Sequence, residues 1–238
     1  KRTYDDKGTK DIYNSDQETF IASHTFHLEN EADFTTGFEH NIQEIDFDTN
    51  IAGYDSTVDK ERHNHGYYFN IDKQFDSGVL CHTGLRLDTP DTFDDQVTGR
   101  VGCSNNGVRL SYSEGYKAPT AYEMYGQDNY GFLGNSNLDV ETSKSYELGY
   151  SWKQNDIVFF YTEIDDMITY SYPTYENDSG IAKSKGIEYN WRQNYGLDWV
   201  VENNFTYNIS KDGSGKEQLR RPEFLNTLSA HYKNYYMD

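Results

Sequence analysis

Four aspartates in a polar stretch are the residues of this sequence best suited to holding a metal ion. Asp46, Asp48, Asp55 and Asp59 lie close together in the chain. Carboxylate oxygens are the ligands that calcium prefers, although the spacing here is not that of an EF-hand loop. The stretch is therefore predicted as a possible calcium site, with a solvated acidic loop as the alternative.

His63 and His65 are a second group with metal-binding potential. In an extended segment, residues two apart point to the same side, so the two imidazoles can face one ion. Asp59 and Glu61 lie nearby. The alternative is again a hydrated loop.

Enzymatic chemistry finds no support in the sequence. A GxSxG elbow, an HExxH motif and a phosphate-binding loop are all absent from it. Glu163, Asp165 and Asp166 include a pair of neighbouring acids, but they fit a solvated strand end better than a catalytic pair. We predict that the protein is not an enzyme.

Cys81 and Cys103 are the only cysteines, and they follow no metal-binding spacing. Counting inward from both sides of the segment 88–96, they fall nearly opposite each other in one predicted hairpin. Directly opposed residues have Cβ atoms about 4.5–5.5 Å apart, which is somewhat wide for a disulfide without local adjustment. A disulfide and two free thiols both remain open.

The composition excludes several classes of protein. A net charge of -19 argues against nucleic-acid binding, which requires a basic surface. Aromatic residues make up 16% of the chain, which argues against disorder. No stretch approaches the length of about 18–20 apolar residues that a membrane helix needs. Few aliphatic and many tyrosine side chains are typical of strands that are wet on one side.

The elements that must position these residues are strands. Apolar and polar residues alternate along much of the chain, and no long helical period occurs. For example, Tyr67, Phe69 and Ile71 fall on one face of an extended segment, and Tyr68 and Asn70 fall on the other. The pattern predicts about ten to twelve strands.

The connections between these strands alternate between short and long. Short turns are expected at residues 76–78, 104–107, 154–156 and 195–197, and long polar linkers at roughly 43–65, 88–96, 116–143, 171–183 and 210–222. This alternation predicts an all-β, antiparallel, up-and-down transmembrane β-barrel with tight turns at one rim and long loops at the other. Arg86, Asp88, Arg100 and Glu114 are then expected to face its water-filled lumen.

Several ordered motifs resemble those of TonB-dependent outer-membrane receptors. They begin with Tyr116-Lys117-Ala118-Pro119, Leu133-Gly134-Asn135-Ser136-Asn137-Leu138 and Tyr146-Glu147-Leu148-Gly149. The segments DIVFFYTEIDDMITY, NDSGIAKSKGIEYNW and LRRPEFLNTLSAHY follow in family order. Ser136 and Val140 stand where the family usually has proline. GFLGNSNLD and IDDMITY resemble cobalamin receptors most closely.

The resemblance implies that residues 1–238 form part of a larger barrel domain and that the plug domain is absent. The whole protein would lie in the bacterial outer membrane, contact its lipid, and import a large scarce nutrient with energy relayed by TonB to the plug. Vitamin B12 is the first expectation for the nutrient and a siderophore or haem the second. A soluble or engineered β-sheet protein with a binding or structural role is the alternative of another class.

The resemblance also places a ligand at the long-loop rim. Tyrosines there offer an apolar ring and a polar hydroxyl, which suits a large, partly polar ligand. The candidate contacts are Tyr116, Tyr122, Tyr125, Gln127, Asn129 and Tyr130. Beyond calcium, no cofactor is expected.

Overall fold

The computed structural model describes residues 2–6, 9–29, 31–51, 54–127, 131–196 and 198–232. It is an antiparallel sheet of twelve strands in the order β1-β2-β3-β4-β5-β6-β7-β8-β9-β12-β13-β14, with a separate hairpin, β10–β11. The strands are β1 (Arg2–Asp6), β2 (Thr9–Leu28), β3 (Ala32–Ile51), β4 (Tyr54–Gln74), β5 (Leu80–Pro90), β6 (Gln96–Asn105), β7 (Val108–Lys117), β8 (Glu141–Trp152), β9 (Asn155–Asp165), β10 (Ile168–Ser171), β11 (Thr174–Asn177), β12 (Ala182–Tyr195), β13 (Trp199–Lys211) and β14 (Phe224–Tyr232), and the helix is α1 (Ala121–Tyr125).

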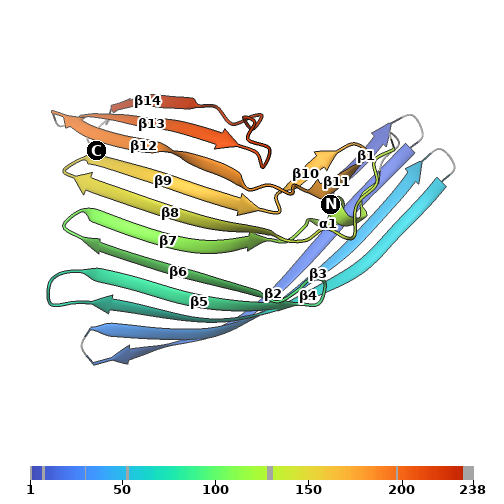
Figure 1. Ribbon diagram of the computed structural model, residues 1–238, viewed down its shortest axis with the longest axis horizontal. Coiled ribbons are helices and arrows are strands. Elements are labelled where there is room, and N and C mark those ends of the chain that lie inside the picture. Colours follow the sequence, from blue (N-terminus) through green and yellow to red (C-terminus); the bar gives the residue numbers. More distant parts are fainter. Residues whose placement is uncertain are drawn as a thin grey trace, which may run out of the picture.

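The strand order follows the chain order, which confirms the predicted up-and-down arrangement. The sheet curves like part of a barrel wall, and β2, β3 and β4 extend beyond the other strands near α1 and the β10–β11 hairpin (Figure 1). No helix in the described part of the chain is long and apolar enough to cross a membrane.

The turn between β6 and β7 shows how the sequence sets the short connections. Asn106 and Gly107 both have positive φ, 47° and 85°. Asparagine and glycine tolerate this conformation, and the resulting turn matches the twist of the paired strands. Asn105 and Val108 are therefore partners in the ladder, as the Asn-Gly signal predicts.

One predicted linker is wrong. Residues 43–65 were expected to form a long loop, but β3 continues through Ile51 and β4 begins at Tyr54, and the two strands pair throughout. The physical reason is that apolar and polar residues do alternate here, but the polar positions carry acidic side chains, so the stretch resembles a polar loop in sequence. Ile45 and Phe47 are buried on one face, while Asp46 and Asp48 are exposed on the other.

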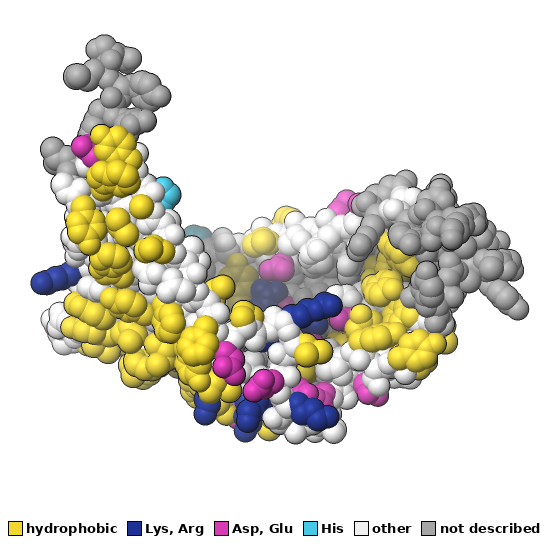
Figure 2. All heavy atoms as spheres, turned by 90° about the horizontal axis from the view of Figure 1, so that it is seen from above, with side chains coloured by type: hydrophobic (Ala, Val, Ile, Leu, Met, Phe, Trp, Pro, Cys, Tyr) yellow, Lys and Arg dark blue, Asp and Glu magenta, His cyan; other side chains and the backbone are white. Residues whose placement is uncertain are grey.

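One face of the sheet is apolar although it is exposed. Cross-strand rows such as Phe69–Leu85 and Leu110–Leu148–Phe159 run across it, and these five side chains are 46–62% exposed. The space-filling view is hollowed, and hydrophobic side chains form a broad band on one arm of it (Figure 2). An apolar band of this extent has the composition of a lipid-facing wall.

Aromatic side chains mark the short-turn edge of this band. Tyr150 stacks on Trp152 with ring centroids 5.4 Å apart, and Trp199 packs against Tyr232 at 5.1 Å. Rings with a polar edge are enriched where a barrel wall meets the membrane–water interface. The opposite, concave face of the sheet carries polar and charged residues.

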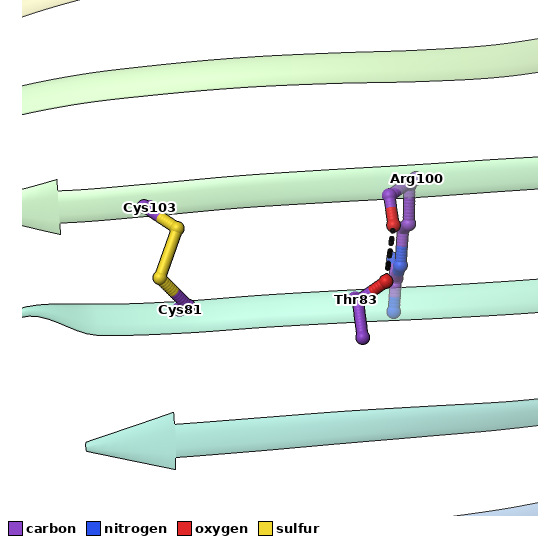
Figure 3. The surroundings of a disulfide bond; sticks show 4 residues. All are labelled: Cys81, Thr83, Arg100 and Cys103. Atoms are coloured by element: carbon purple, nitrogen blue, oxygen red, sulfur yellow. Dashed lines mark hydrogen bonds between the residues drawn. A yellow bond between two sulfur atoms is a disulfide. The ribbon is translucent and has the colours of Figure 1, made fainter. Parts of the chain in front are cut away.

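The two cysteines lie on the apolar face, near the short-turn rim. Cys81 and Cys103 are direct partners in the β5–β6 ladder and are joined by a disulfide, with their Cα atoms 4.1 Å apart (Figure 3). Nearby, the Thr83 hydroxyl donates to the Arg100 carbonyl at 3.1 Å. The bond therefore links strands that the backbone ladder already pairs.

We expect the disulfide to form in the complete receptor. A non-reduced digest analysed by mass spectrometry should contain one linked species carrying Cys81 and Cys103. For a bridge spanning 22 residues, reduction should lower the free energy of unfolding by about 2–4 kcal/mol. Alkylation of both thiols before any reductant is added would contradict this prediction.

Candidate functional site

A charged cluster lies on the concave face of β3, β4 and β5. Arg86 binds Asp88 with both arms of its guanidinium, Nε to Oδ2 at 2.7 Å and Nη2 to Oδ1 at 2.8 Å. Arg86 also donates to Glu39 at 3.2 Å, and Asn64 donates to Asp88 at 2.8 Å. Asp88 is only 1% exposed, so these donors take the place of water as its hydrogen-bond partners.

The predicted lumen charges are therefore only partly confirmed. Arg86, Asp88 and Arg100 share the concave face, where Arg100 donates to Asn70 at 2.9 Å. Glu114 was expected there as well, which is wrong. It accepts from the Tyr112 hydroxyl at 2.7 Å and, as residue i+2 of one strand, shares the apolar face with that tyrosine.

The described residues 118–127 and 131–140 leave β7 and fold back over the extended strands. Helix α1 starts at a capping box, in which Glu123 N–H donates to the Thr120 hydroxyl and Thr120 N–H donates to the Glu123 carboxylate. This arrangement satisfies two helix N–H groups that would otherwise lack partners. It fixes a helix too short to be stable alone.

Helix α1 packs on the concave face of β3 and β4. Ala121 contacts Ile45 and Phe47 in a small buried core, with Val58 and Tyr125 at its edge. This core explains why β3 and β4 continue so far: their inward apolar residues are covered by the loop.

Arg62 on β4 fastens the same loop. Its Nη1 donates to the Pro119 carbonyl at 3.0 Å, and the guanidinium lies over the Tyr125 ring, 5.9 Å from its centroid. Arg62 is 8% exposed, and its Nε and Nη2 have no hydrogen-bond partner among the described residues. Burial lowers the pKa of this guanidinium, while Tyr125 and Asp91 oppose that shift.

A second set of contacts holds residues 133–135 against α1 and the β10–β11 hairpin. Gly134 N–H donates to the Gly126 carbonyl at 2.7 Å, and Asn135 N–H donates to the Glu123 carbonyl at 2.9 Å. The Asn135 amide also donates to the Tyr175 carbonyl at 3.0 Å. The loop is thus tied at both of its ends.

Aromatic rings from three distant segments meet at the long-loop rim: β2, the connection between β7 and β8, and the β10–β11 hairpin. Tyr122 stacks on Phe132 with centroids 5.0 Å apart, and Tyr13 meets Tyr122 edge to face at 5.6 Å. Tyr170 and Tyr175 flank Phe132 at 6.0 and 5.6 Å. Burial raises the pKa of Tyr175, and nearby Glu123 adds to the shift, so the hydroxyl stays protonated.

The structure brings together some of the predicted ligand residues. Tyr122 and Tyr125 belong to one surface, and the Gln127 carbonyl joins them by accepting from the Tyr13 hydroxyl at 3.0 Å. Tyr116 lies apart, beside Asp88 and Arg86. Asn129 and Tyr130 lie outside the described residues.

Three of the four aspartates predicted to bind calcium, Asp46, Asp48 and Asp59, face away from the aromatic surface at the long-loop rim. Asp46 and Asp59 are partners across β3 and β4, Asp48 follows on the same exposed face, and Asn14 donates to Asp46 at 3.2 Å. The side chain of Asp55 is outside the described part. Among the described residues, no three His, Cys, Asp or Glu side chains are arranged to hold a metal ion.

Sequence reasoning missed five residues of this surface: Arg62, Tyr13, Phe132, Tyr170 and Tyr175. Local signals existed only for Phe132, inside the GFLGNSNLD motif, and for Tyr170, at the end of IDDMITY. The others come together through long-range packing.

The comparisons with known proteins agree with this architecture. Residues 1–236 match the family described as TonB dependent receptor-like, beta-barrel. The chain belongs to the TonB-dependent receptor family. This family comprises outer-membrane transporters rather than enzymes, so the wall with its apolar face is part of an outer-membrane barrel. The soluble alternative is therefore wrong.

Individual relatives match parts of longer proteins. The vitamin B12 transporter BtuB of Vibrio cholerae is 27% identical over 186 residues, which are 72% of this chain and 29% of that protein. The siderophore receptor PirA from Pseudomonas aeruginosa has a TM-score of 0.68 at 21% identity, over 85% of this chain and 41% of that one. The ferric enterobactin receptor PfeA of the same organism has a TM-score of 0.74 at 18% identity, covering 94% and 40%. The chain thus spans less than half the length of these TonB-dependent receptors.

Proposed function

We propose that the complete receptor binds cobalamin at the long-loop rim and imports it across the outer membrane. The observation that carries this proposal is the 27% identity to a vitamin B12 transporter over 72% of the chain. Energy would reach the receptor from TonB through a plug domain. The wall described above would hold the loops at a fixed place in the membrane.

The geometry of the rim supports a large ligand with both polar and apolar parts. The Tyr122–Phe132 stack offers ring faces, and neighbouring hydroxyls and carbonyls offer hydrogen-bonding groups. Aromatic rings supply large contact areas at little cost in side-chain entropy, because they have only two rotatable bonds.

In this proposal, calcium orders the β3–β4 extension whether or not cobalamin is bound. Asp46, Asp48, Asp55 and Asp59 would supply oxygen ligands on the outer side of the β3–β4 extension, after side-chain movement. Calcium accepts six to eight such ligands in flexible geometry. Its removal would then loosen the extension and weaken cobalamin binding.

A second candidate is an iron chelate, either a siderophore or haem. The observation that favours it is the buried Arg62, whose Nε and Nη2 have no hydrogen-bond partner in the part of the chain that the structure describes. If loop movement exposed them, these donors would suit an anionic chelate with aromatic groups.

Calorimetry tests the two candidates on the complete receptor in detergent. Cyanocobalamin should bind tightly, and more weakly after calcium is removed by a chelator. A receptor that shows heat-modifiable gel migration, and is therefore folded, but binds no cyanocobalamin would leave the iron chelate as the substrate. Binding that is unchanged by calcium removal would remove calcium from the proposal.

The aromatic surface should contribute measurably to binding. We expect Tyr122→Ala and Tyr125→Ala in the complete receptor each to weaken cyanocobalamin binding about tenfold, because each removes a large ring at the rim. Tyr195→Ala is the matched control, since that ring is 53% exposed but lies at the end of β12, on the short-turn rim. Unchanged affinity in the first two variants would contradict this placement of the ligand.

A further inference from the structure

Three histidines lie together on the outward face of β3 and β4, just beyond the apolar band. His40 and His65 are direct partners across the two strands, and His63 lies two residues from His65 on the same face. Phe38 stacks on His65 with ring centroids 6.0 Å apart. The cluster therefore begins where the apolar band ends on the side of the β3–β4 extension.

The imidazoles of this cluster face one another closely. The Nδ1 atoms of His40 and His65 are 3.1 Å apart. The ring of His40 also stacks on that of His63, with centroids 5.7 Å apart and planes at 14°. On the far side of His63, Nε2 lies 2.6 Å from Glu61 Oε1.

Two ring nitrogens at this distance match the geometry of a metal site. In the absence of an ion, one nitrogen must donate its hydrogen to the other. With metal–nitrogen bonds of about 2.05 Å, nitrogens 3.1 Å apart subtend an angle of about 98° at the metal. This angle lies between the values for square-planar and tetrahedral coordination.

Glu61 orients His63 and sets its tautomer so that His63 can act as a third ligand. Its carboxylate accepts from Nε2, which fixes the hydrogen there and leaves the Nδ1 lone pair available. Histidines that bind metals commonly donate their other ring nitrogen to a carboxylate in this way. The Glu61–His63 pair is therefore compatible with a metal-binding role for His63.

Some movement is needed to complete the site. The rings of His40 and His65 are inclined by only 17°, so one of them must turn to aim its lone pair at the ion. Consistent with this, no three potential ligands in the described part of the chain are arranged to hold an ion as they stand. Rotation of an imidazole about its Cβ–Cγ bond is a soft motion.

We propose that His40, His63 and His65 bind a d-block divalent cation, with Glu61 orienting His63. Imidazole ligands select Zn²⁺, Cu²⁺ or Ni²⁺ over Ca²⁺ and Mg²⁺, which require oxygen ligands. The ion links β3 to β4 at the base of their extension. The site is distinct from the aspartates considered for calcium.

The site does not depend on the nutrient that the receptor imports. β3 and β4 are flanked by β2 and β5, so the neighbouring strands of the wall are present in this chain. The cluster faces away from α1 and the ligand mouth. Metal binding and cobalamin binding can therefore succeed or fail separately.

Zinc titration of the complete receptor, stripped of metal with a chelator and folded in detergent, tests the proposal. We expect one zinc site that excess Ca²⁺ does not displace. His40→Asn and His65→Asn should each weaken binding at least tenfold, and Glu61→Gln about tenfold, in line with the loss of an orienting partner. Copper bound to the same site should show nitrogen hyperfine structure in its electron paramagnetic resonance spectrum.

His24→Asn is the matched control, because His24 shares the outward face on β2 but lies apart from the cluster. Heat-modifiable migration establishes that each variant is folded. Zinc binding that is absent from the unsubstituted receptor, or equal in the folded His40→Asn and His24→Asn variants, would overturn the proposal.

Discussion

Gly134→Ala should release the rim loop from helix α1 in the complete receptor. A Cβ at Gly134 would lie 2.6 Å from the Met124 carbonyl carbon and oxygen and from the Tyr125 nitrogen. These are backbone atoms of the helix, so they cannot turn aside as a flexible side chain would. The loop must therefore move away, losing the hydrogen bonds from Gly134 and Asn135.

The expected size of this effect follows from the cost of overpacking. Extra volume in a well-packed site costs about 1–3 kcal/mol. The substitution destabilises the loop conformation that binds the ligand. Cyanocobalamin affinity should therefore drop by about 5- to 150-fold. Chymotrypsin cleavage after Tyr122 or Tyr125 should accelerate by a similar factor, since local opening exposes these bonds.

Proteolysis separates this prediction from the identity of the nutrient, because it requires no ligand. Gly99→Ala serves as the control, since the nearest atom to its added Cβ, Leu85 Cδ2, lies at an ordinary contact distance of 3.4 Å. If Gly134→Ala were cleaved as slowly as Gly99→Ala, the packing of the loop on α1 would be refuted.

Asp88→Ala should destabilise the barrel wall by about 2–3 kcal/mol. It removes the carboxylate that receives both arms of Arg86 and a bond from Asn64. Removing one partner of a buried ion pair costs about 3–5 kcal/mol. Because Arg86 is 31% exposed, we expect a loss of stability at the lower end of that range or below it. The free energy of unfolding in urea measures the loss.

Asp156→Ala is the matched comparison for this variant. Arg109 binds Asp156 through the same two-point geometry, at 2.7 and 2.6 Å, but the two side chains are 39% and 29% exposed. Water screens such a pair, so its removal should cost about 1 kcal/mol or less. Equal losses in the two variants would show that burial does not set the strength of the Arg86–Asp88 pair.

The repeating parts of the fold were predictable from sequence because their causes are local. Asn106-Gly107 specifies a tight turn, and the alternation around Tyr67, Phe69 and Ile71 specifies a strand with one apolar face. The length of β3 was harder to predict. Its alternation at Ile45 and Phe47 is surrounded by acidic residues, and the strand becomes necessary only when α1 covers those two side chains.

The candidate site was less predictable than the wall. The Thr120-x-x-Glu123 spacing of a capping box was present as a local signal for α1, and it was overlooked among strand patterns. No local signal could bring Tyr13 to Tyr122, more than a hundred residues later. Such contacts depend on strand register and loop packing, which single-residue patterns do not encode.

The paired extension of β3 and β4 also affects how the receptor binds its ligand. From His40 to Ile51 the strand rises by roughly 35–40 Å at about 3.3 Å per residue. The loop that carries Tyr122 rests on this ribbon through buried contacts. The surface is therefore preorganised: much of the entropy that a free loop would lose on binding has already been lost during folding. We expect a nutrient arriving from outside to meet a rigid platform, and association to require little rearrangement of this half of the mouth.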